Sequence, residues 1–242
     1  MADFKTHMTV STGCGAALAF AGYQAGMHWT TCALAGGLCS VSGMLPDLDS
    51  DSGRPLREAT TLAAAVVPML MVERMEKLQL SHEVMVLVAA GIYLTIRFVI
   101  AELFRRYTVH RGMWHSMPAA LTVAMAAFLI MQTEDISARL FKTAGVFLGF
   151  LSHLILDEIW SVDYRRGSYA FKRSFGTAFK LWGNDRWANM ATYLQLAIIG
   201  FLVYHDSGFM ERFGIQHEHP DVPHTAQELF QVIKERSQSW RR

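Results

Sequence analysis

The sequence is short of charged residues. Asp, Glu, Lys and Arg make up 18% of the 242 residues, against roughly 25% in soluble domains. The formal net charge is +1, which excludes an acidic disordered chain and a globally basic nucleic-acid-binding protein. Only three cysteines are present, without the spacing of a metal knuckle. An odd, low count argues against a secreted domain held together by disulfides.

The charges are also missing locally. Residues 6–46 contain no Asp, Glu, Lys or Arg. Because one membrane-spanning helix needs about 20 apolar residues, this stretch has room for two helices, with a break at residues 23–26. Further apolar stretches cover residues 59–72, 84–101, 117–131, 143–156 and 190–204. We predict an all-α, polytopic helical membrane bundle of about six or seven spans. A soluble helical bundle is the alternative, because several stretches are short for a span.

The basic residues predict an orientation. With seven spans, the N-terminus and residues 46–58, 102–116 and 158–189 share one side, which carries 12 Lys and Arg. The short loops at 73–83 and 132–142 carry 4, so the first side should be cytoplasmic. We expect a membrane-embedded domain at residues 1–204, followed by a polar tail at 205–242.

An acidic cluster follows the second apolar segment. Residues 43–53 read GMLPDLDSDSG, and Asp47, Asp49 and Asp51 alternate along them. Acids this close repel one another unless a cation or bases neutralise them. Carboxylate oxygens suit magnesium or manganese and also join histidine at zinc. A solvated acidic turn is the simpler interpretation of this cluster alone.

Two histidine-containing clusters lie on the same predicted side. Residues 110–116 read HRGMWHS, which suits metal binding by imidazole and anion binding by arginine; a basic stretch at the lipid headgroups is the alternative. Residues 152–158 read SHLILDE, where His153 and Asp157 share one helix face. Ionisable groups at membrane depth suggest function, although His153 alone could be a packing residue. His7 alone would be read as solvated.

The three motifs, in this order across apolar stretches, resemble those of the LexA-regulated, membrane-bound, metal-dependent hydrolase family. The resemblance covers roughly residues 1–182. It implies a bacterial inner-membrane protein distantly similar to zinc-dependent phospholipase C. It differs at Met113 and Trp114, where the family has a small or β-branched residue followed by threonine. The implied metal ligands are His7, Asp47, Asp49, His115, His153 and Asp157.

From these candidate ligands we hypothesise a metal-dependent hydrolysis. A divalent metal, zinc first and manganese or magnesium as alternatives, would lower the pKa of a bound water to about 7. Asp49 would act as general base, with Asp157 as the alternative, and Ser116 would support the ligands. His110 and Arg111 would hold an anionic leaving group or phosphoryl oxygen. The expected substrate is an ester or phosphoester of a lipid-like molecule.

Residues 158–189 predict a membrane-interface segment, because aromatic and basic residues interleave along them. We expect membrane lipid as a partner and no nucleic acid, although single-stranded nucleic acid would suit the same composition. Two other functions stay open. One is a cation transporter in which the same acids and histidines form the ion path. The other is a non-catalytic membrane protein with a structural metal.

Overall fold

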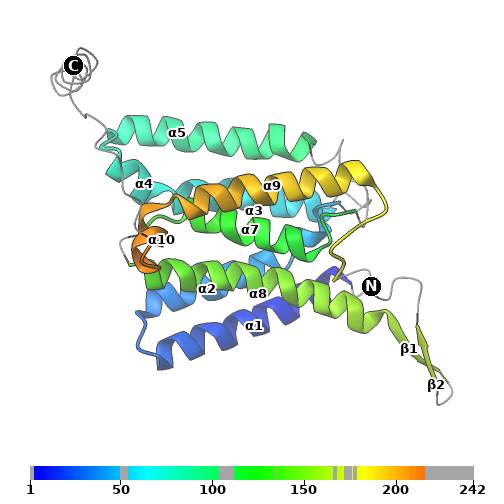
Figure 1. The fold of residues 1–242 in the computed structure, drawn as a ribbon. Coiled ribbons are helices and arrows are strands. Elements are labelled where there is room, and N and C mark those ends of the chain that lie inside the picture. Colours follow the sequence, from blue (N-terminus) through cyan, green and yellow to red (C-terminus); the bar gives the residue numbers. More distant parts are fainter. Residues whose placement is uncertain are drawn as a thin grey trace, which may run out of the picture.

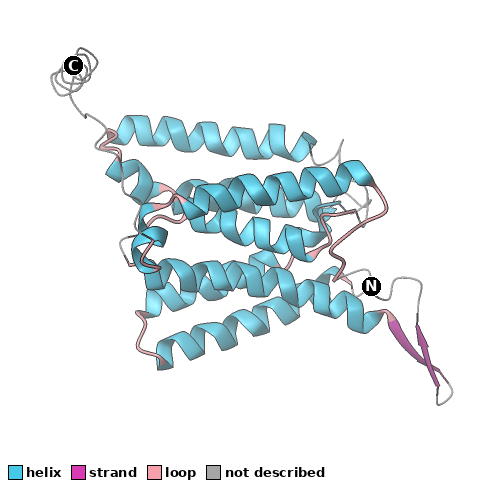
Figure 2. Cartoon of the chain, in the orientation of Figure 1, coloured by secondary structure: helices cyan, strands magenta, loops and turns pink. Residues whose placement is uncertain are grey.

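A computed structural model describes residues 3–49, 54–103, 112–133, 135–165, 168–171, 176 and 179–215. The described chain is helical apart from one short hairpin (Figures 1 and 2). Its elements in chain order are α1 (Phe4–Gln24), α2 (Trp29–Ser42), the 3-10 helix η1 (Leu45–Asp49), α3 (Arg54–Leu70), α4 (Val72–Lys77), α5 (His82–Leu94), the π-helix η2 (Thr95–Ile100), α7 (Met117–Ile130), α8 (Ile136–Trp160), β1 (Val162–Arg165), β2 (Ser168–Phe171), α9 (Arg186–Tyr204) and α10 (Ser207–Arg212).

The apolar stretches predicted from the sequence are helical. They fall largely in α3, in α5 with η2, in α7, in α8 and in α9, and the predicted break at residues 23–26 separates α1 from α2. Polar side chains begin several of these helices. Asp3 accepts a hydrogen bond from Thr6 N at 2.9 Å, and Asp135 and Asp185 cap α8 and α9 in the same way. Such caps satisfy amide groups that have no partner within the helix.

Three helical segments in the described residues are long and apolar enough to cross a membrane. They are the 22-residue segment His82–Leu103, the 25-residue α8 and the 19-residue α9. Helix α7 is apolar but has only 14 residues. The chain therefore has the helices of a membrane protein, while the count of six or seven spans stays a prediction.

The interface-like segment after α8 contains a feature that the sequence did not predict. Strands β1 and β2 pair antiparallel, with Val162 opposite Phe171, and extend from the end of α8 (Figure 1). The predicted polar tail begins with α10, which contacts α8 and α9. Residues 216–242 lie outside the described part of the chain.

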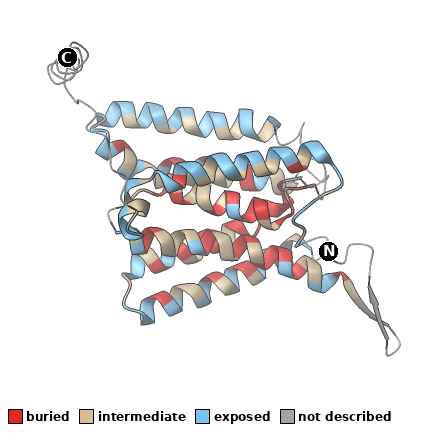
Figure 3. Ribbon diagram, viewed as in Figure 1, coloured by how far each residue is buried: buried red, intermediate tan, exposed pale blue. Residues whose placement is uncertain are grey.

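Helices α1, α2 and α8 pack through small residues, and this close packing positions the site. A methyl group on Gly15 of α1 would come within 2.3 Å of Gly36 O in α2. A methyl group on Gly149 of α8 would come within 2.0 Å of Cys39 O. The backbones therefore touch, as in helix pairs in membranes, where small residues replace bulky apolar side chains at the contact. Buried residues gather on these helices and on α7 (Figure 3).

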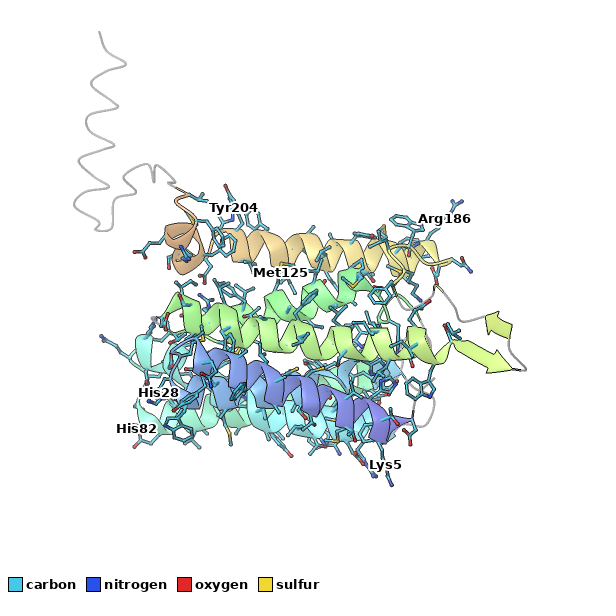
Figure 4. All side chains as sticks on the ribbon, turned by 90° about the horizontal axis from the view of Figure 1, so that it is seen from below. Lys5, His28, His82, Met125, Arg186 and Tyr204 are labelled. Atoms are coloured by element: carbon cyan, nitrogen blue, oxygen red, sulfur yellow. The ribbon has the colours of Figure 1, made fainter. Side chains whose placement is uncertain are left out.

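Different residues mark the two ends of the bundle. Lys5 and Arg186 mark one end, and His28, His82 and Tyr204 mark the other (Figure 4). At the second end, Arg139 binds both carboxylate oxygens of Asp206, at 2.7 and 2.9 Å. Its Nε also donates to Phe128 O at 2.8 Å. This arginine therefore ties the ends of α7, α8 and α9 together, away from the predicted site.

Candidate metal centre

Five of the predicted site residues converge at the end of the bundle marked by Lys5 and Arg186. His7 lies in the second turn of α1, and Asp47 lies in η1, directly after α2. His115 precedes α7, and His153 and Asp157 occupy the last turns of α8. We call His7, Asp47, His115, His153 and Asp157 the candidate metal centre.

His153 lies in the middle of the candidate metal centre, next to each of the other four residues. Its Nε2 lies 3.6 Å from Asp47 Oδ1 and 3.8 Å from Asp157 Oδ2. The ring of His7 stacks on it with centroids 3.6 Å apart, and the ring of His115 approaches edge-on at 5.6 Å. His7 Nε2 lies 3.3 Å from Asp157 Oδ1, and His115 Nε2 lies 3.9 Å from Asp47 Oδ1.

The candidate metal centre is buried. His7 is 2% exposed, His153 is fully buried, and Asp47 and His115 are also buried. Both ring nitrogens of His7, Nε2 of His153 and Oδ1 of Asp157 make no hydrogen bond. The 3.3 Å approach of His7 to Asp157 is thus an electrostatic contact without hydrogen-bond geometry. Buried polar atoms without partners are costly, so this arrangement favours a ligand that all of them share.

A hydrogen bond to a backbone carbonyl fixes the orientation of the His153 ring. Its Nδ1 donates to Gly43 O at 2.7 Å, because a backbone carbonyl can only accept. The proton therefore sits on Nδ1, and the Nε2 lone pair points at the two carboxylates. Gly43 lies against α1, where a methyl group on it would come within 2.4 Å of Ser11 Cβ. The seam between α1 and α2 thus carries the carbonyl that orients His153.

The donor set fits a divalent cation. One ligand atom each from His7, Asp47 and His153 lie within 4.8 Å of one another, and so do those from His115, His153 and Asp157. Two ligands of a tetrahedral zinc, each about 2.0–2.1 Å from the ion, are about 3.3 Å apart. The separations of 3.3–3.9 Å in the centre are close to this value. Imidazole nitrogens with carboxylate oxygens are also a usual zinc ligand set.

Trp114 joins the two loops that carry Asp47 and His115. Its Nε1 donates to Leu45 O at 2.7 Å, and its ring packs edge-on against Phe150 of α8 at 6.3 Å. Leu45 is two residues from Asp47, and Trp114 precedes His115. The position at which the chain departs from the family pattern is therefore a direct link between two candidate ligands.

The remaining predicted residues are placed differently. Ser116 is buried and caps α7, and its hydroxyl contacts Met113 O and Ala119 N rather than a candidate ligand. The side chain of Asp49 and the whole of His110 and Arg111 lie outside the described part of the chain. Their proposed roles stay predictions.

Sequence reasoning missed the parts that support the candidate metal centre. It did not identify the Gly43 carbonyl, and it named Trp114 only as a departure from the family pattern, since both groups act through contacts between distant segments. One signal for the close packing was available. Gly145 and Gly149 are spaced four residues apart on α8, and His153 follows at the same spacing. This is the small-residue pattern of tightly packed membrane helices.

Comparisons with known proteins agree with a membrane protein. The family model of the YdjM inner membrane protein matches residues 1–205. This range includes every residue of the candidate metal centre. No match was found among curated proteins or among solved structures.

Proposed function

The chain belongs to the YdjM inner membrane protein family, and we propose that it is a membrane-bound, metal-dependent hydrolase. The proposed substrate is an ester or phosphoester of a lipid-like molecule, attacked by a metal-activated water. The proposal rests on one observation. Three imidazoles and two carboxylates, from four segments of the chain, lie close together inside the bundle. Several of their polar atoms have no hydrogen-bond partner.

One ion suits the candidate metal centre better than two. Both three-residue groups with ligand spacing include His153. Because its Nε2 has a single lone pair, the two groups describe alternative parts of one site. A catalytic tetrahedral zinc takes three protein ligands and one water, and five residues are present. We propose zinc first, with manganese or magnesium as alternatives that accept more oxygen ligands.

A carboxylate that does not ligate the ion is proposed to act in proton transfer. A divalent cation held by these residues would make a water acidic enough to ionise near neutral pH. A carboxylate of Asp157 or Asp49 that is not ligating the ion would take the proton of that water. His153, held by Gly43 O, stays a neutral ligand through this step. His110 and Arg111 are proposed to hold the anionic part of the substrate.

The location of the candidate metal centre supports a lipid-like substrate. It lies at one end of the bundle, close to the start of α1 and the end of α8. We propose that this end faces the cytoplasm, as the basic residues predict. The ester and phosphoester bonds of lipids lie at the surface of the bilayer, where this end of the bundle would be. A transporter instead needs ionisable groups along a path through the bundle. A structural metal site is the second alternative and would have no open position for water.

Metal analysis of the detergent-purified full chain tests the proposal. We expect about one zinc or manganese ion per chain, as for a single mononuclear site. His153→Ala should lose it. His82→Ala is the matched control, because His82 is an exposed histidine at the opposite end. No metal in the native chain would refute metal dependence.

Activity is measured separately. The loaded protein is incubated with vesicles of phosphatidylglycerol and phosphatidylethanolamine and with a soluble phosphoester, and products are identified by mass spectrometry. Hydrolysis that is lost in His153→Ala and kept in His82→Ala supports the hydrolase. Bound metal without any hydrolysis favours the structural metal, and cation flux in proteoliposomes favours the transporter.

A further inference from the structure

The chain enters α9 through a short segment with outward-facing apolar side chains. We call residues 179–183 the strap. Phe179 is 41% exposed, Leu181 is 63% exposed and Trp182 is 67% exposed. Trp187, in the first turn of α9, is 75% exposed. In water, four large apolar side chains exposed together would be unfavourable, so this surface requires a partner.

The strap is held from the inside by hydrogen bonds. The fully buried Asn189 receives Gly183 N on its Oδ1 and donates from its Nδ2 to Gly183 O, both at 2.8 Å. Tyr193 donates its hydroxyl to Leu181 O at 2.6 Å, and its ring lies 5.3 Å from that of Trp182. Since these backbone groups are satisfied inward, the outer face can contact an apolar medium without leaving them unpaired.

The outer face of the strap continues into a stripe that runs the length of α9. Large exposed apolar residues follow one another at intervals of three or four residues: Trp187, Met190, Leu194, Ile198 and Phe201. Helix α9 is one of the candidate membrane spans. From Trp187 to Tyr204 it rises about 26 Å at 1.5 Å per residue, close to the roughly 30 Å hydrocarbon core of a bilayer. Aromatic residues are enriched at both boundaries of that core.

The strap also touches the loop of the candidate metal centre. A methyl group on Gly183 would lie 3.2 Å from Met113 Sδ, and Met113 is buried two residues before His115. Upstream of the strap, Gly176 N donates to Glu158 Oε1 at 2.6 Å, and Glu158 directly follows Asp157. These contacts keep the strap close to His115 and fix its neighbouring segment to the end of α8.

We propose that the strap and Trp187 form a membrane anchor that seats in the headgroup–acyl boundary of one leaflet. The partner is the phospholipid bilayer itself. Because Gly183 packs against Met113, the anchor sets the candidate metal centre at the depth of that boundary. The anchor follows from the exposed residues and the length of α9. It does not rest on metal binding or hydrolysis.

Tryptophan fluorescence tests the anchor in the full chain reconstituted in phosphatidylglycerol–phosphatidylcholine nanodiscs. Lipids carry bromine either near the ester end or near the tip of the acyl chain, and iodide is the aqueous quencher. The contribution of each residue is the signal that disappears in Trp182→Phe or in Trp187→Phe. Trp114→Phe provides the comparison, because Trp114 packs inside the bundle.

We expect the emission of Trp182 and Trp187 to be quenched at least about twofold more by shallow than by deep bromine, and weakly by iodide. Strong iodide quenching without bromine quenching would place the strap in water and overturn the proposal. Quenching by neither would show that protein covers the strap and would overturn it as well. As a second variant, Asn189→Leu removes the hydrogen bonds to Gly183 and should reduce shallow quenching of Trp182 more than that of Trp187.

Discussion

The imidazole rings of His7 and His153 lie face to face, with centroids 3.6 Å apart and planes tilted by 11°. They come from α1 and α8, which touch each other and share contacts with α2. Their ring nitrogens lie near the carboxylate of Asp157, at 3.3 Å for His7 and 3.8 Å for His153, an arrangement that suits a shared cation. If the centre binds an ion, as we propose, its occupation should stabilise the contact between α1 and α8.

Removal of metal should lower the stability of the native chain. An ion present at about 100 times its dissociation constant stabilises the folded state by about 2.7 kcal/mol. We expect a chelator to reduce the unfolding temperature in detergent and added zinc to restore it. His7→Phe retains a ring for stacking but has no nitrogen ligand, so its response to the chelator should be smaller. The same response in native chain and variant would exclude His7 as a ligand.

The close contact between α2 and α8 at Gly149 should be required for the candidate metal centre as well as for the fold. In Gly149→Ala, the added methyl group would lie 2.0 Å from Cys39 O and 2.1 Å from Ser42 Oγ. Both neighbours belong to α2, so α2 and α8 must separate, at a cost of about 1–3 kcal/mol. Gly37→Ala is the matched control, since a methyl group there meets nothing within 4 Å.

We expect Gly149→Ala to show a lower unfolding temperature and a weaker zinc affinity, measured by competition with a fluorescent chelator. Gly37→Ala should resemble the native chain in both measurements. If Gly149→Ala bound zinc as tightly as the native chain, the close packing of α8 on α2 would not be what positions His153.

Trp114 should act on metal affinity through its indole nitrogen. Trp114→Phe keeps an aromatic ring against Phe150 but removes the hydrogen bond to Leu45 O. A hydrogen bond of this kind contributes about 0.5–1.5 kcal/mol, so zinc affinity should fall by roughly two- to tenfold. The visible spectrum of bound cobalt reports the ligand geometry. An unchanged affinity and cobalt spectrum would limit Trp114 to packing.

The sequence indicated the candidate ligands but not the packing that brings them together. Asp47, His115, His153 and Asp157 stand in recognisable motifs, and alternating apolar stretches place their segments at one end of a bundle. Burial of His7 was not predictable from its neighbours, because it depends on the approach of α1 to α2 at Gly15 and Gly36. The hairpin of β1 and β2 was also missed, since its aromatic and basic residues indicate a membrane interface more clearly than a strand.

The ion pair of Arg139 and Asp206, at the end of the bundle opposite the candidate metal centre, allows a pH test that does not depend on metal binding. Asp206 lies beyond α9 and is bound by both Nη atoms of the buried Arg139. Burial raises the pKa of Asp206, but the hydrogen bonds and positive charge of Arg139 lower it by more, so that its pKa lies below the ordinary value. A carboxyl group with a depressed pKa in the folded state stabilises that state fully only above its unfolded pKa, about 3.9 for aspartate.

This contribution should therefore be constant near neutral pH and decline as the pH falls below about 4 toward the folded pKa of Asp206. In Asp206→Asn, part of the acid-dependent fall in unfolding temperature should be absent. At neutral pH the variant should be less stable by about 3–5 kcal/mol, because Arg139 stays buried without its partner. Thermal unfolding in detergent between about pH 3 and about pH 7, which spans the titration of aspartate, measures both effects. Parallel curves for the native chain and the variant would show that the ion pair does not couple to pH. Zinc content should be unchanged, since Asp206 follows Tyr204, the last residue of α9, which lies at the opposite end of the helix from Arg186 (Figure 4).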